Sequence, residues 1–390
     1  MTDKETSEKL RILVVCDVLG EENNGTTIAA MNLIRYLKSR GHEVRVLSPD
    51  ADKSGLEGYY TVPTLNLGAP LNAYVKKVGV ALSKPQADVI AAAINGAEHV
   101  HAMLPFALGT AAVKAACERG ISTTAGFHMQ AENFTSYVKM NGVRWLNNAV
   151  YRYVDKHFYR FVDAVHYPTE FIRGVFEEKI KRKTNGYVIS NGVHEYVQKR
   201  ESERPQSLQG KFVILTTGRY AREKAQDTLI KAVALSKHKE RIQLILGGQG
   251  VKEKSYRKLS EKLPVYPIFA FYSRKELIDV LNYADMYVHP AEFELEGISC
   301  LEAVACGKLT VVSDSKLSAT KAFALDEKCI FKNRDPKSLA RVMDYWIEHP
   351  AERAEYEKRY LETAVAFRQD ECMKRMEEMI FEVHRAKKRS

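Results

Sequence analysis

The sequence predicts an α/β protein built from two doubly wound domains. The chain has 390 residues, which is enough for two domains of ordinary size, each with its own core. Short, β-rich apolar runs alternate with longer stretches of helical period along most of that length. Such alternation is typical of parallel sheets that are covered by helices on both faces. One polar segment, 197–210, interrupts the alternation and indicates a linker between the two domains.

The first domain is predicted to cover residues 1–196. Residues 11–16 form an apolar run that predicts a buried strand, and 26–39 carry apolar residues at helical spacing. Gly41 ends this helix, and residues 43–48 form the next predicted strand. Further strands of the same domain are expected at 99–102, 122–127, 164–167 and 186–189.

The second domain is predicted at 211–366. Its strands are expected at 211–217, 242–246, 268–271, 286–289 and 309–313. A helical region begins at 335, and we expect residues 367–390 to form a C-terminal helix that packs back toward the first domain. Two doubly wound domains create a cleft between the carboxyl ends of their sheets, which is where open α/β sheets bind ligands.

The composition is that of a globular protein without a membrane span. Hydrophobic residues make up 45% of the chain and charged residues 28%. No apolar run approaches the roughly 18 residues that cross a bilayer, and the polar beginning of the chain does not resemble a signal peptide. We therefore expect a cytoplasmic protein, which can lie at the inner face of the plasma membrane.

The net charge and the cysteine content limit the classes of partner and of metal site that the protein can have. The net charge of +10 favours an anionic partner. No zinc-finger spacing, basic-zipper heptad or RNA-recognition signature occurs, so we expect no nucleic-acid partner. The six cysteines are scattered and form no Cys-x-x-Cys pair, which predicts reduced thiols and no metal site.

The most informative segment is an acidic loop between the fourth strand of the second domain and the next helix. Gly297 is expected to open that helix, so the backbone N–H groups of Gly297, Ile298 and Ser299 suit a phosphate or a sugar hydroxyl. Glu294 lies in the loop, and Glu302, about one turn into the helix, can accept hydrogen bonds from two ribose hydroxyls. The alternative is an acidic helix N-terminus that only complements the helix dipole.

A second segment follows the first strand of the second domain. Gly218 ends that strand, and Arg219 and Lys224 lie in the loop and helix start after it. Two cations beside a helix N-terminus can clamp a diphosphate, because arginine offers a fork of donors and lysine a point charge. Such a clamp would hold a leaving group as negative charge grows on it. The alternative is a pair of solvated surface charges.

Together these segments resemble the family 4 retaining glycosyltransferases, whose GT-B fold has two Rossmann-like domains facing across a cleft. That family is marked by a glutamate, seven residues and a second glutamate, here Glu294 and Glu302. Other motifs of the family occur in the usual order at 218–224, 247–250, 271–277, 284–290 and 301–307. Within the family, the chain is most similar to bacterial lipid- or glycan-directed members such as the diacylglycerol glucosyltransferases.

The resemblance implies roles for individual residues. Glu302 would bind the ribose, Glu294 would contact hydroxyls of the donor sugar, and Arg219 and Lys224 would neutralise the diphosphate. His128 would contact the donor sugar beside the reacting carbon; a structural histidine at a strand end is the alternative. The implied catalytic residues are His128, Arg219, Lys224 and Glu294, and the implied donor-binding residues are Gly25, Thr26, Gly218, Gly248, Tyr272, Gly297, Ile298, Ser299 and Glu302.

The resemblance also implies an activity. It is the transfer, with retention, of a hexose or N-acetylhexosamine from a UDP-sugar to a membrane lipid or lipid-linked glycan. No carboxylate is clearly placed as a nucleophile, which favours a front-face reaction in which the departing phosphate helps to deprotonate the acceptor. We expect no cofactor and no metal. Asp50 and Asp52 have the Asp-x-Asp form of a metal motif from another transferase fold, but they lack that fold around them.

Several alternatives stay open. The acceptor could instead be a soluble small molecule or a growing polysaccharide, and a non-catalytic module that binds nucleotide sugars is a further candidate. A nicotinamide dehydrogenase is disfavoured because residues 247–250 lack the Gly-x-Gly-x-x-Gly spacing. Residues 137–161 interleave aromatic and basic residues, which suits the surface of an anionic bilayer. A core-packing helix with solvated charges explains the same pattern equally well.

Overall fold

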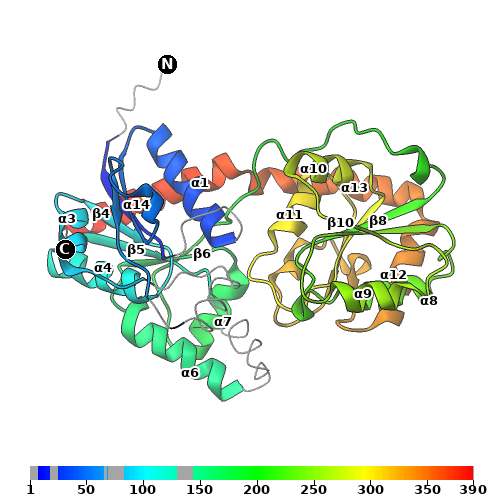
Figure 1. The fold of residues 1–390 in the computed structure, drawn as a ribbon, viewed down its shortest axis with the longest axis horizontal. Helices are drawn as coiled ribbons and strands as arrows, with labels where there is room; N and C mark the ends of the chain where they lie inside the picture. The colour runs from blue at the N-terminus through cyan, green and yellow to red at the C-terminus, as the bar shows by residue number, and fades with distance from the viewer. Residues whose placement is uncertain (1–7, 18–24, 66–67, 69–82, 130–143, 390) are drawn as a thin grey trace. The chain divides into compact units, whose positions relative to one another are not determined.

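The computed structural model describes residues 8–17, 25–65, 68, 83–129 and 144–389. The chain divides into two compact units (Figure 1). The first unit consists of Met1–Asn191 together with Cys372–Ser390, and the second unit consists of Gly192–Glu371. Both units are parallel sheets covered by helices, as the alternation of strands and helices in the sequence predicts.

The first unit contains a seven-stranded parallel sheet in the order β3-β2-β1-β4-β5-β6-β7. Its strands are β1 (Arg11–Val15), β2 (Glu43–Ser48), β3 (Tyr59–Thr61), β4 (His99–Ala102), β5 (Ser122–Gly126), β6 (Ala164–Tyr167) and β7 (Gly186–Val188). The strands expected from the sequence are confirmed to within one residue at either end. The sequence did not predict β3, because three half-buried residues at the edge of a sheet carry no clear pattern.

Helices cover both faces of the first sheet. They are α1 (Gly25–Ser39), α3 (Ala87–Ile94), α4 (Ala107–Glu118), α6 (Arg144–Val154), α7 (Glu170–Ile180) and most of α14 (Gln369–Arg389). In α1, the buried residues Ala30, Leu33 and Leu37 recur at helical spacing and so form one apolar face. This face shares a hydrophobic core with β1 and with the buried methionines of α14. The C-terminal helix is therefore part of the core of the first unit.

The second unit contains a six-stranded parallel sheet in the order β10-β9-β8-β11-β12-β13. Its strands are β8 (Phe212–Thr217), β9 (Ile242–Gly247), β10 (Ile268–Ala270), β11 (Met286–His289), β12 (Thr310–Ser313) and β13 (Ile330–Phe331). The strand order reverses between β8 and β11, and in such sheets ligands bind at the carboxyl ends of the strands beside that point. Both strands that flank the reversal were predicted, whereas the two-residue edge strand β13 was not.

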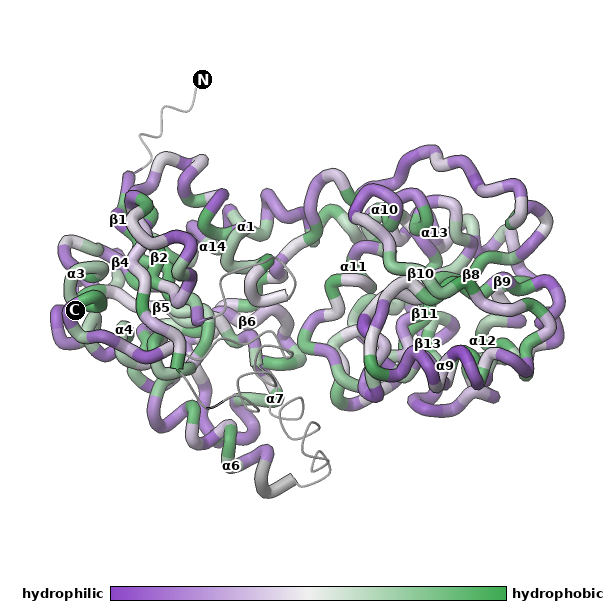
Figure 2. Tube along the Cα trace, viewed as in Figure 1, coloured by the Kyte–Doolittle hydropathy of each residue, from purple (hydrophilic) through white to green (hydrophobic). Residues whose placement is uncertain are grey.

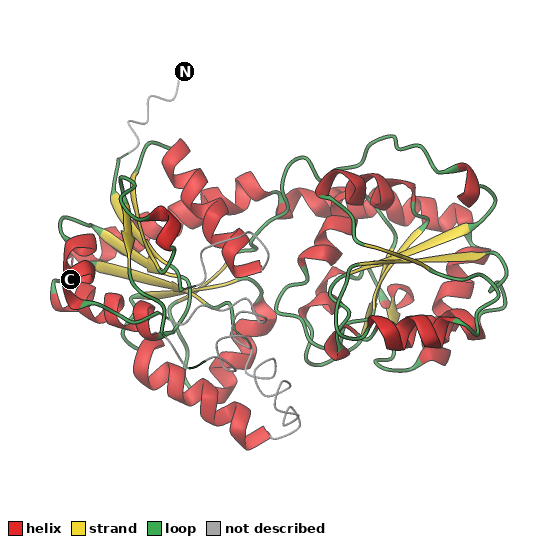
Figure 3. Cartoon of the chain, viewed as in Figure 1, coloured by secondary structure: helices red, strands yellow, loops and turns green. Residues whose placement is uncertain are grey.

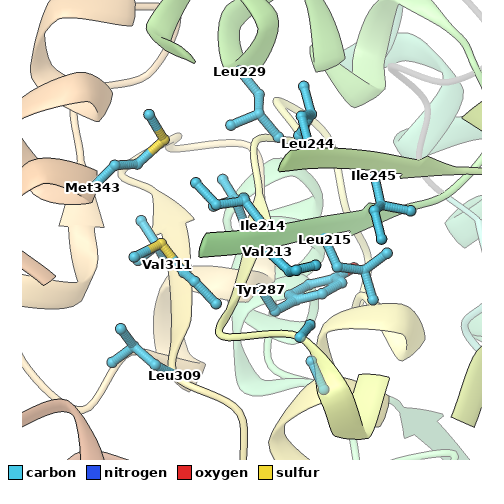
Figure 4. Packing of buried hydrophobic residues seen from close by; sticks show 14 of the residues in the cluster. Val213, Ile214, Leu215, Leu229, Leu244, Ile245, Tyr287, Leu309, Val311 and Met343 are labelled. Atoms are coloured by element: carbon cyan, nitrogen blue, oxygen red, sulfur yellow. The ribbon is translucent and has the colours of Figure 1, made fainter. Parts of the chain in front are cut away.

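Helices enclose the second sheet as well. They are α8 (Gln226–Leu235), α9 (Glu253–Ser260), α10 (Arg274–Tyr283), α11 (Ile298–Ala305), α12 (Pro336–Glu348) and α13 (Pro350–Ala364). The strands lie between α8, α9 and α12 on one side and α10 and α11 on the other (Figure 3). Figure 4 shows the interior, where Leu215 of β8, Leu244 of β9 and Tyr287 of β11 belong to one cluster of buried side chains with Met343 of α12. Buried apolar runs on adjacent strands thus hold the sheet in register.

The segment expected to be a linker, 197–210, packs on the second unit. Its two apolar side chains, Val197 and Leu208, are buried in the core of that unit, and the guanidinium of Arg204 donates to the carbonyl of Tyr283. The boundary between the two units lies just before this segment, between Asn191 and Gly192, and the role of 197–210 as a linker stays a prediction.

Hydropathy follows the layers of the second unit (Figure 2). The central strands run through hydrophobic residues, whereas the outer helix α9 is largely hydrophilic. Among the described residues, no helix combines the length and the apolar character that crossing a membrane requires.

Candidate functional site

The carboxyl ends of the second sheet gather most of the residues that the sequence singled out. Gly218 follows β8, Gly248 follows β9, Tyr272 lies two residues after β10, and Glu294 lies in the loop after β11. Since these strands are parallel, all four residues lie along one edge of the sheet. The fold of the second unit therefore assembles the predicted donor-binding segments at the edge where a ligand is expected.

Two glycine turns interlock at this edge. Gly218 (φ 143°) donates from its N–H to the carbonyl of Gly247 (2.9 Å), and Gly248 (φ 153°) donates to the carbonyl of Ala270 (2.7 Å). A Cβ atom on residue 248 would lie 2.1 Å from the carbonyl oxygen of Gly218, closer than any side chain can approach. Both positions therefore require glycine, and the exposed backbone of these turns can approach a ligand closely.

Glu294 lies at the centre of the site. Its backbone is fixed to the loop after β12, since its N–H donates to Leu317 (3.3 Å) and its carbonyl accepts from Ala319 (3.0 Å). Its largely buried carboxylate contacts the Nζ of Lys224 and accepts a hydrogen bond from Nε2 of His289 (2.9 Å). Backbone and side chain are thus both held in place.

Electrostatics keep the Glu294 carboxylate ionised. Burial by itself raises the pKa of this group, because it penalises the charged form. The ammonium of Lys224 and the hydrogen bond from His289 outweigh that penalty and lower the pKa to about 2. The predicted cation and the predicted carboxylate are therefore one ion pair at neutral pH.

The two predicted cations differ in their surroundings. Lys224 ends a short 3-10 turn, and only 19% of its side chain is exposed beside Glu294. The Arg219 side chain is 65% exposed, and its guanidinium lies 3.8 Å from Glu223. The structure thus brings Lys224, but not Arg219, into the Glu294 cluster.

The N-terminus of α11 is open as the sequence predicts. Gly297 caps it with φ 87°, and a Cβ at this position would lie 2.5 Å from the Thr320 side chain, so only glycine fits. The carbonyl of Gly297 accepts the first helical hydrogen bonds, from Cys300 and Leu301. The N–H groups of Gly297, Ile298 and Ser299 precede those bonds and have no partner within the helix.

Glu302 lies within α11 and is buried. Burial raises the pKa of its carboxyl group, and the guanidinium of Arg274 opposes that rise. Nη1 of Arg274 donates to Oε1 of Glu302 (2.7 Å) from the first residue of α10. A ligand hydroxyl at this carboxylate would share it with Arg274, a residue that the sequence did not single out.

Sequence reasoning also missed a histidine and its supporting tyrosine. His289 ends β11 with its side chain 2% exposed, and its Nδ1 lies 3.2 Å from the hydroxyl of Tyr287. Both residues lie within the motif at 284–290, but neither was given a role. Tyr287 and His289 are two residues apart on one strand and so share a face, whereas the contact of His289 with Glu294 crosses into the loop and follows from no strand or helix period.

The first unit holds the remaining predicted residues. Gly25 and Thr26 open α1, where Gly25 is exposed and Thr26 half-buried. His128 follows β5 and folds back over Gly126, so that a Cβ at position 126 would lie 2.6 Å from its Nε2. That nitrogen is buried and has no hydrogen-bond partner among the described residues. The predicted segment continues into 130–133, which lies outside them.

Two further imidazoles, those of His99 and His101, form a series of hydrogen bonds with hydroxyl groups on the neighbouring strand. Nδ1 of His101 bonds to the hydroxyl of Thr124 (2.8 Å), which also bonds to Nε2 of His99 (2.7 Å). Nδ1 of His99 then meets the hydroxyl of Ser122 (2.9 Å). The bonds join neighbouring residues of β4 and β5, so hydroxyls on one strand serve the imidazoles on the other.

Burial keeps these imidazoles neutral. It lowers the pKa of His101 and His128 well below the usual value of 6.5. It also lowers the pKa of His99 to about 3 and that of His166, whose ring lies 5.7 Å from the His128 ring, to about 4. These four imidazoles are therefore uncharged at neutral pH.

Residues 151–161 form a surface with two distinct sides; the beginning of the predicted membrane segment, 137–143, lies outside the described residues. The segment continues α6 through a π-helical turn at Asp155–Tyr159. Its buried side chains are Tyr151, Val154, Asp155, Phe158 and Tyr159. Its exposed side chains are Arg152, Tyr153, Lys156, His157, Arg160 and Phe161. The exposed side is therefore basic and also carries two aromatic rings, of which Tyr153 is 65% exposed and Phe161 43%.

Metal binding has no obvious location in the described residues, where no group of three or more His, Cys, Asp and Glu side chains could hold an ion. Of the Asp-x-Asp pair, Asp52 is bound to Lys53 (3.0 Å). Burial raises the pKa of Asp50 to about 6, with a further rise from the charge of Asp52. Whether the reaction depends on a metal stays a prediction from the sequence.

Comparison with known protein families covers nearly the whole chain. Residues 23–195 match the model described as Glycosyltransferase Family 4, and residues 197–362 match the model described as Glycosyl transferases group 1. The boundary between the two matches lies close to the boundary between the two units.

Individual relatives agree with these matches. The chain is 24% identical over 314 residues to the alpha-monoglucosyldiacylglycerol synthase of Acholeplasma laidlawii, covering 74% of this chain and 76% of that protein. It is 23% identical over 317 residues to a GDP-mannose-dependent alpha-mannosyltransferase of Mycobacterium tuberculosis, covering 78% and 79%. Among solved structures, Anabaena Alr3699/HepE in complex with UDP and glucose superposes with a TM-score of 0.70 at 16% identity, over 96% of this chain and 100% of that one. This last likeness is one of fold.

Proposed function

Because the chain belongs to the family 4 glycosyltransferases with the GT-B fold, we propose that it moves a hexose or N-acetylhexosamine from a UDP-sugar to a membrane lipid or lipid-linked glycan. The observation that carries this proposal is the cluster of Glu294, Lys224 and His289 at the carboxyl edge of the second sheet. It places a fixed carboxylate and a cation in contact, beside interlocked glycine turns. A sugar diphosphate needs both a hydroxyl acceptor and a counter-charge.

The donor nucleotide would occupy the edge formed by β8 to β11. Glu302 would accept the ribose hydroxyls beside Arg274, and the backbone around Tyr272 would meet the base. Gly218, Gly248 and the open N-terminus of α11 would offer backbone N–H groups to oxygens of the diphosphate or the sugar. Lys224 would neutralise the diphosphate, with Arg219 at the solvent side. In the first unit, Gly25 and Thr26 would contribute to donor binding and His128 would contact the sugar.

The proposed reaction proceeds with retention and without a metal. The bond between the anomeric carbon and the phosphate oxygen breaks, and the acceptor oxygen bonds to that carbon on the same face. The acceptor proton passes to the departing phosphate oxygen. Since Glu294 is tied to Lys224 and His289, its part is to hold the donor sugar rather than to attack the carbon. Stabilisation of the departing phosphate by Lys224 would supply much of the catalysis.

The nature of the nucleotide is the first point to test. One relative in the family uses GDP-mannose, as its name states, whereas a solved structure of the same fold holds UDP and glucose. We propose uridine, following the resemblance of residues 271–277 to the segment of the family that meets this base.

A panel of UDP- and GDP-sugars, tested for binding and for hydrolysis in the presence of a chelator, addresses both donor and metal. We expect saturable binding of a UDP-sugar that the chelator leaves unchanged and that a Glu302→Gln, Lys224→Ala double variant abolishes. Binding of a GDP-sugar alone would replace the proposed donor. Failure to bind UDP, GDP or any of their sugars would favour the non-catalytic module.

The proposal of a lipid acceptor is based on the exposed face of residues 151–161. Three cations and two exposed aromatic rings on one side of the segment suit the headgroup region of an anionic bilayer, where aromatic rings insert and cations meet lipid phosphates. The relative from Acholeplasma laidlawii is named for a glycolipid product, which supports a lipid acceptor. A protein of this kind would act at the inner, cytoplasmic face of the plasma membrane.

Sedimentation with vesicles distinguishes a lipid acceptor from a soluble or polysaccharide acceptor. We expect the protein to sediment with vesicles that contain phosphatidylglycerol and not with pure phosphatidylcholine. A Tyr153→Ser, Lys156→Gln variant should lose this binding, whereas Lys254→Gln, Lys258→Gln on the exposed surface of α9 should keep it. Equal sedimentation of both variants would contradict the proposed membrane surface.

A further inference from the structure

Glu294 is held by two groups of different character, and only Lys224 was anticipated from the sequence. We infer that His289 is a positioning residue that aims the Glu294 carboxylate at the donor sugar. This inference rests on the proposed function, in which Glu294 contacts hydroxyls of that sugar. It assigns a role to a residue that would otherwise count as part of the buried core.

The contacts of His289 form a chain that starts in the core of the second unit. The hydroxyl of Thr217, the last residue of β8, lies 3.0 Å from the hydroxyl of Tyr287. Tyr287 lies within the buried cluster that Figure 4 shows, and its hydroxyl is 3.2 Å from Nδ1 of His289. Nε2 of His289 is 2.9 Å from Oε1 of Glu294. The carboxylate at the sheet edge is therefore connected to two core strands through side chains alone.

This series of side-chain contacts also bears on the direction of the hydrogen bonds that His289 makes. Burial raises the pKa of the Tyr287 hydroxyl, against the smaller opposing effects of Ser299 and Thr217, so this group stays protonated. The ionised carboxylate of Glu294 can only accept, so Nε2 of His289 carries the proton of that bond. In the tautomer with its proton on Nε2, Nδ1 accepts from the hydroxyl of Tyr287, so Tyr287 supports the tautomer that donates to Glu294.

Lys224 and His289 cannot substitute for each other. The lysine ammonium lies on a flexible stem, and it is also the group proposed to meet the diphosphate, so its contact with Glu294 has to be shared once a donor binds. The imidazole is rigid, its side chain is 2% exposed, and it belongs to a central strand. His289 therefore keeps the carboxylate in one orientation while Lys224 turns to the phosphates.

Two amide substitutions at position 289 test which imidazole nitrogen is required for the contact with Glu294. Glutamine at position 289 can place an N–H near the position of Nε2 and so preserve the bond to Glu294. Asparagine reaches only to the position of Nδ1 and loses that bond. In donor hydrolysis, we expect His289→Asn to lower kcat roughly 10–100-fold, as a misplaced contact does, and His289→Gln to recover most of the loss. Affinity for UDP, which lacks the sugar, should stay the same in both variants.

A matched control is available in the same unit. His238 forms a similar pair with Glu348 (3.0 Å) on the surface, so His238→Asn should leave hydrolysis unchanged. If His289→Asn hydrolyses the donor as fast as the wild type, or if kcat and UDP affinity fall together in both amide variants, the inference is wrong. If the wild type hydrolyses no nucleotide sugar, the proposed function itself fails.

A measurement without turnover tests the inference in that last case too. Nitrogen-15 NMR of the free protein reports which nitrogen of His289 carries the proton. We expect the proton on Nε2 and a bare Nδ1, with the Nδ1 resonance shifting in Tyr287→Phe. A proton on Nδ1 with a bare Nε2 would overturn the inference whatever the donor, because Nε2 could then donate nothing to Glu294.

Discussion

The two units differ in the buried polar groups around the residues proposed to meet the donor sugar. In the first unit, histidines on and after β4, β5 and β6 are neutral, and hydroxyls of Ser122 and Thr124 satisfy several of their nitrogens. In the second unit, the loop after β11 holds an ionised carboxylate, Glu294, which is paired with Lys224 and bonded to His289. Similar sheets with the same order of their first four strands thus place a neutral imidazole beside one predicted site residue, His128, and a largely buried ion pair at another, Glu294.

This difference between neutral imidazoles and an ion pair indicates which unit is suited to bind a charged ligand. A buried neutral imidazole needs only a hydrogen-bond partner, whereas a buried carboxylate needs a cation as well. Burying an ion pair costs desolvation free energy, so an ion pair is a poor way to fix a side chain unless a ligand also interacts with the charges. We therefore assign the diphosphate to the second unit and the neutral contacts to the first, and four experiments test that division.

Removal of the Lys224 ammonium should have the largest effect. In Lys224→Ala, the leaving diphosphate would lose the cation proposed to neutralise it, and we expect donor turnover to fall about 10²–10³-fold. Burial then dominates at Glu294, so the pKa of this carboxyl rises from about 2 and the acid limb of the rate profile moves to higher pH. Steady-state hydrolysis across pH measures both effects.

The control for this variant is Lys237→Ala, whose side chain is 73% exposed in the same unit. It should leave both the rate and its pH dependence as they are. Wild-type turnover in Lys224→Ala would remove the ion pair from the proposed mechanism and, with it, the contrast between the units.

Neutralising Glu302 should act on binding rather than on the chemical step. In Glu302→Gln, the ribose loses hydrogen bonds to a charged group, each of which is typically stronger than about 1.5 kcal/mol, so UDP affinity should fall roughly 10–100-fold. Calorimetric titration with UDP measures the loss. Glu253→Gln on the surface of α9, where the carboxylate is paired with Arg257, should bind UDP as the wild type does. An unchanged affinity in Glu302→Gln would place the ribose elsewhere.

A methyl group added in the first unit tests whether a neutral side chain matters there. The Cβ of Gly126→Ala would lie 2.6 Å from Nε2 and 2.7 Å from Cδ2 of His128, so the ring must move. We expect turnover to fall roughly tenfold, as misplaced groups in active sites do, with little change in UDP affinity. Gly174→Ala in α7 is the control, since nothing lies within 4 Å of its added Cβ.

A double variant completes this test. If Gly126→Ala acts through the His128 ring, it should add nothing to His128→Ala, because the ring is then already absent. Full additivity of the two losses would show that Gly126 matters for another reason.

Much of the architecture could be predicted from the sequence, because most strands and helices have a local hydrophobic pattern. Buried strands such as β8 and β11 are short apolar runs, and their ends were predicted to within one residue. The edge strands β3 and β13 have no such pattern, and their pairing is decided by neighbours distant in the sequence. The packing of the polar segment 197–210 on the second unit could not be predicted, because it depends on two isolated apolar residues and on ion pairs of Arg200 and Arg204 with partners about 80 residues away.

The site could be predicted where its residues form a motif. Glu294, Glu302 and Lys224 were found through spacing and order, since helix and strand ends fix their positions. Arg274 and His289 lie within the motifs at 271–277 and 284–290 but were given no role, because their importance lies in which carboxylate they contact. Arg274 is 28 residues from its partner, and such a pairing exists only once the sheet has placed α10 beside α11.

The last effect we predict is on stability rather than on turnover or binding, and it separates the units by pH. The folded-state pKa values of His99 and His166, about 3 and 4, lie below the unfolded value near 6.5. The folded state therefore binds fewer protons than the unfolded state, and stability is lost as the pH falls below about 6.5. At pH 5 the loss is about 2 kcal/mol for each such histidine.

Glu294 loses its stabilising contribution in the same direction but at lower pH, since its folded pKa of about 2 lies below the unfolded value of 4.5. Its stabilising contribution is complete above pH 4.5 and declines only as the pH falls toward 2. Between pH 6.5 and pH 5, the protection factors of hydrogen exchange, which correct for the slower intrinsic exchange at lower pH, should therefore fall in β4 and β5 of the first unit and not in β8 and β11 of the second. His99→Gln should weaken the pH dependence of the first unit by removing one titrating group. An equal fall in both units would mean that the two units unfold together, and no fall in β4 and β5 would mean that the imidazoles are charged in the folded protein.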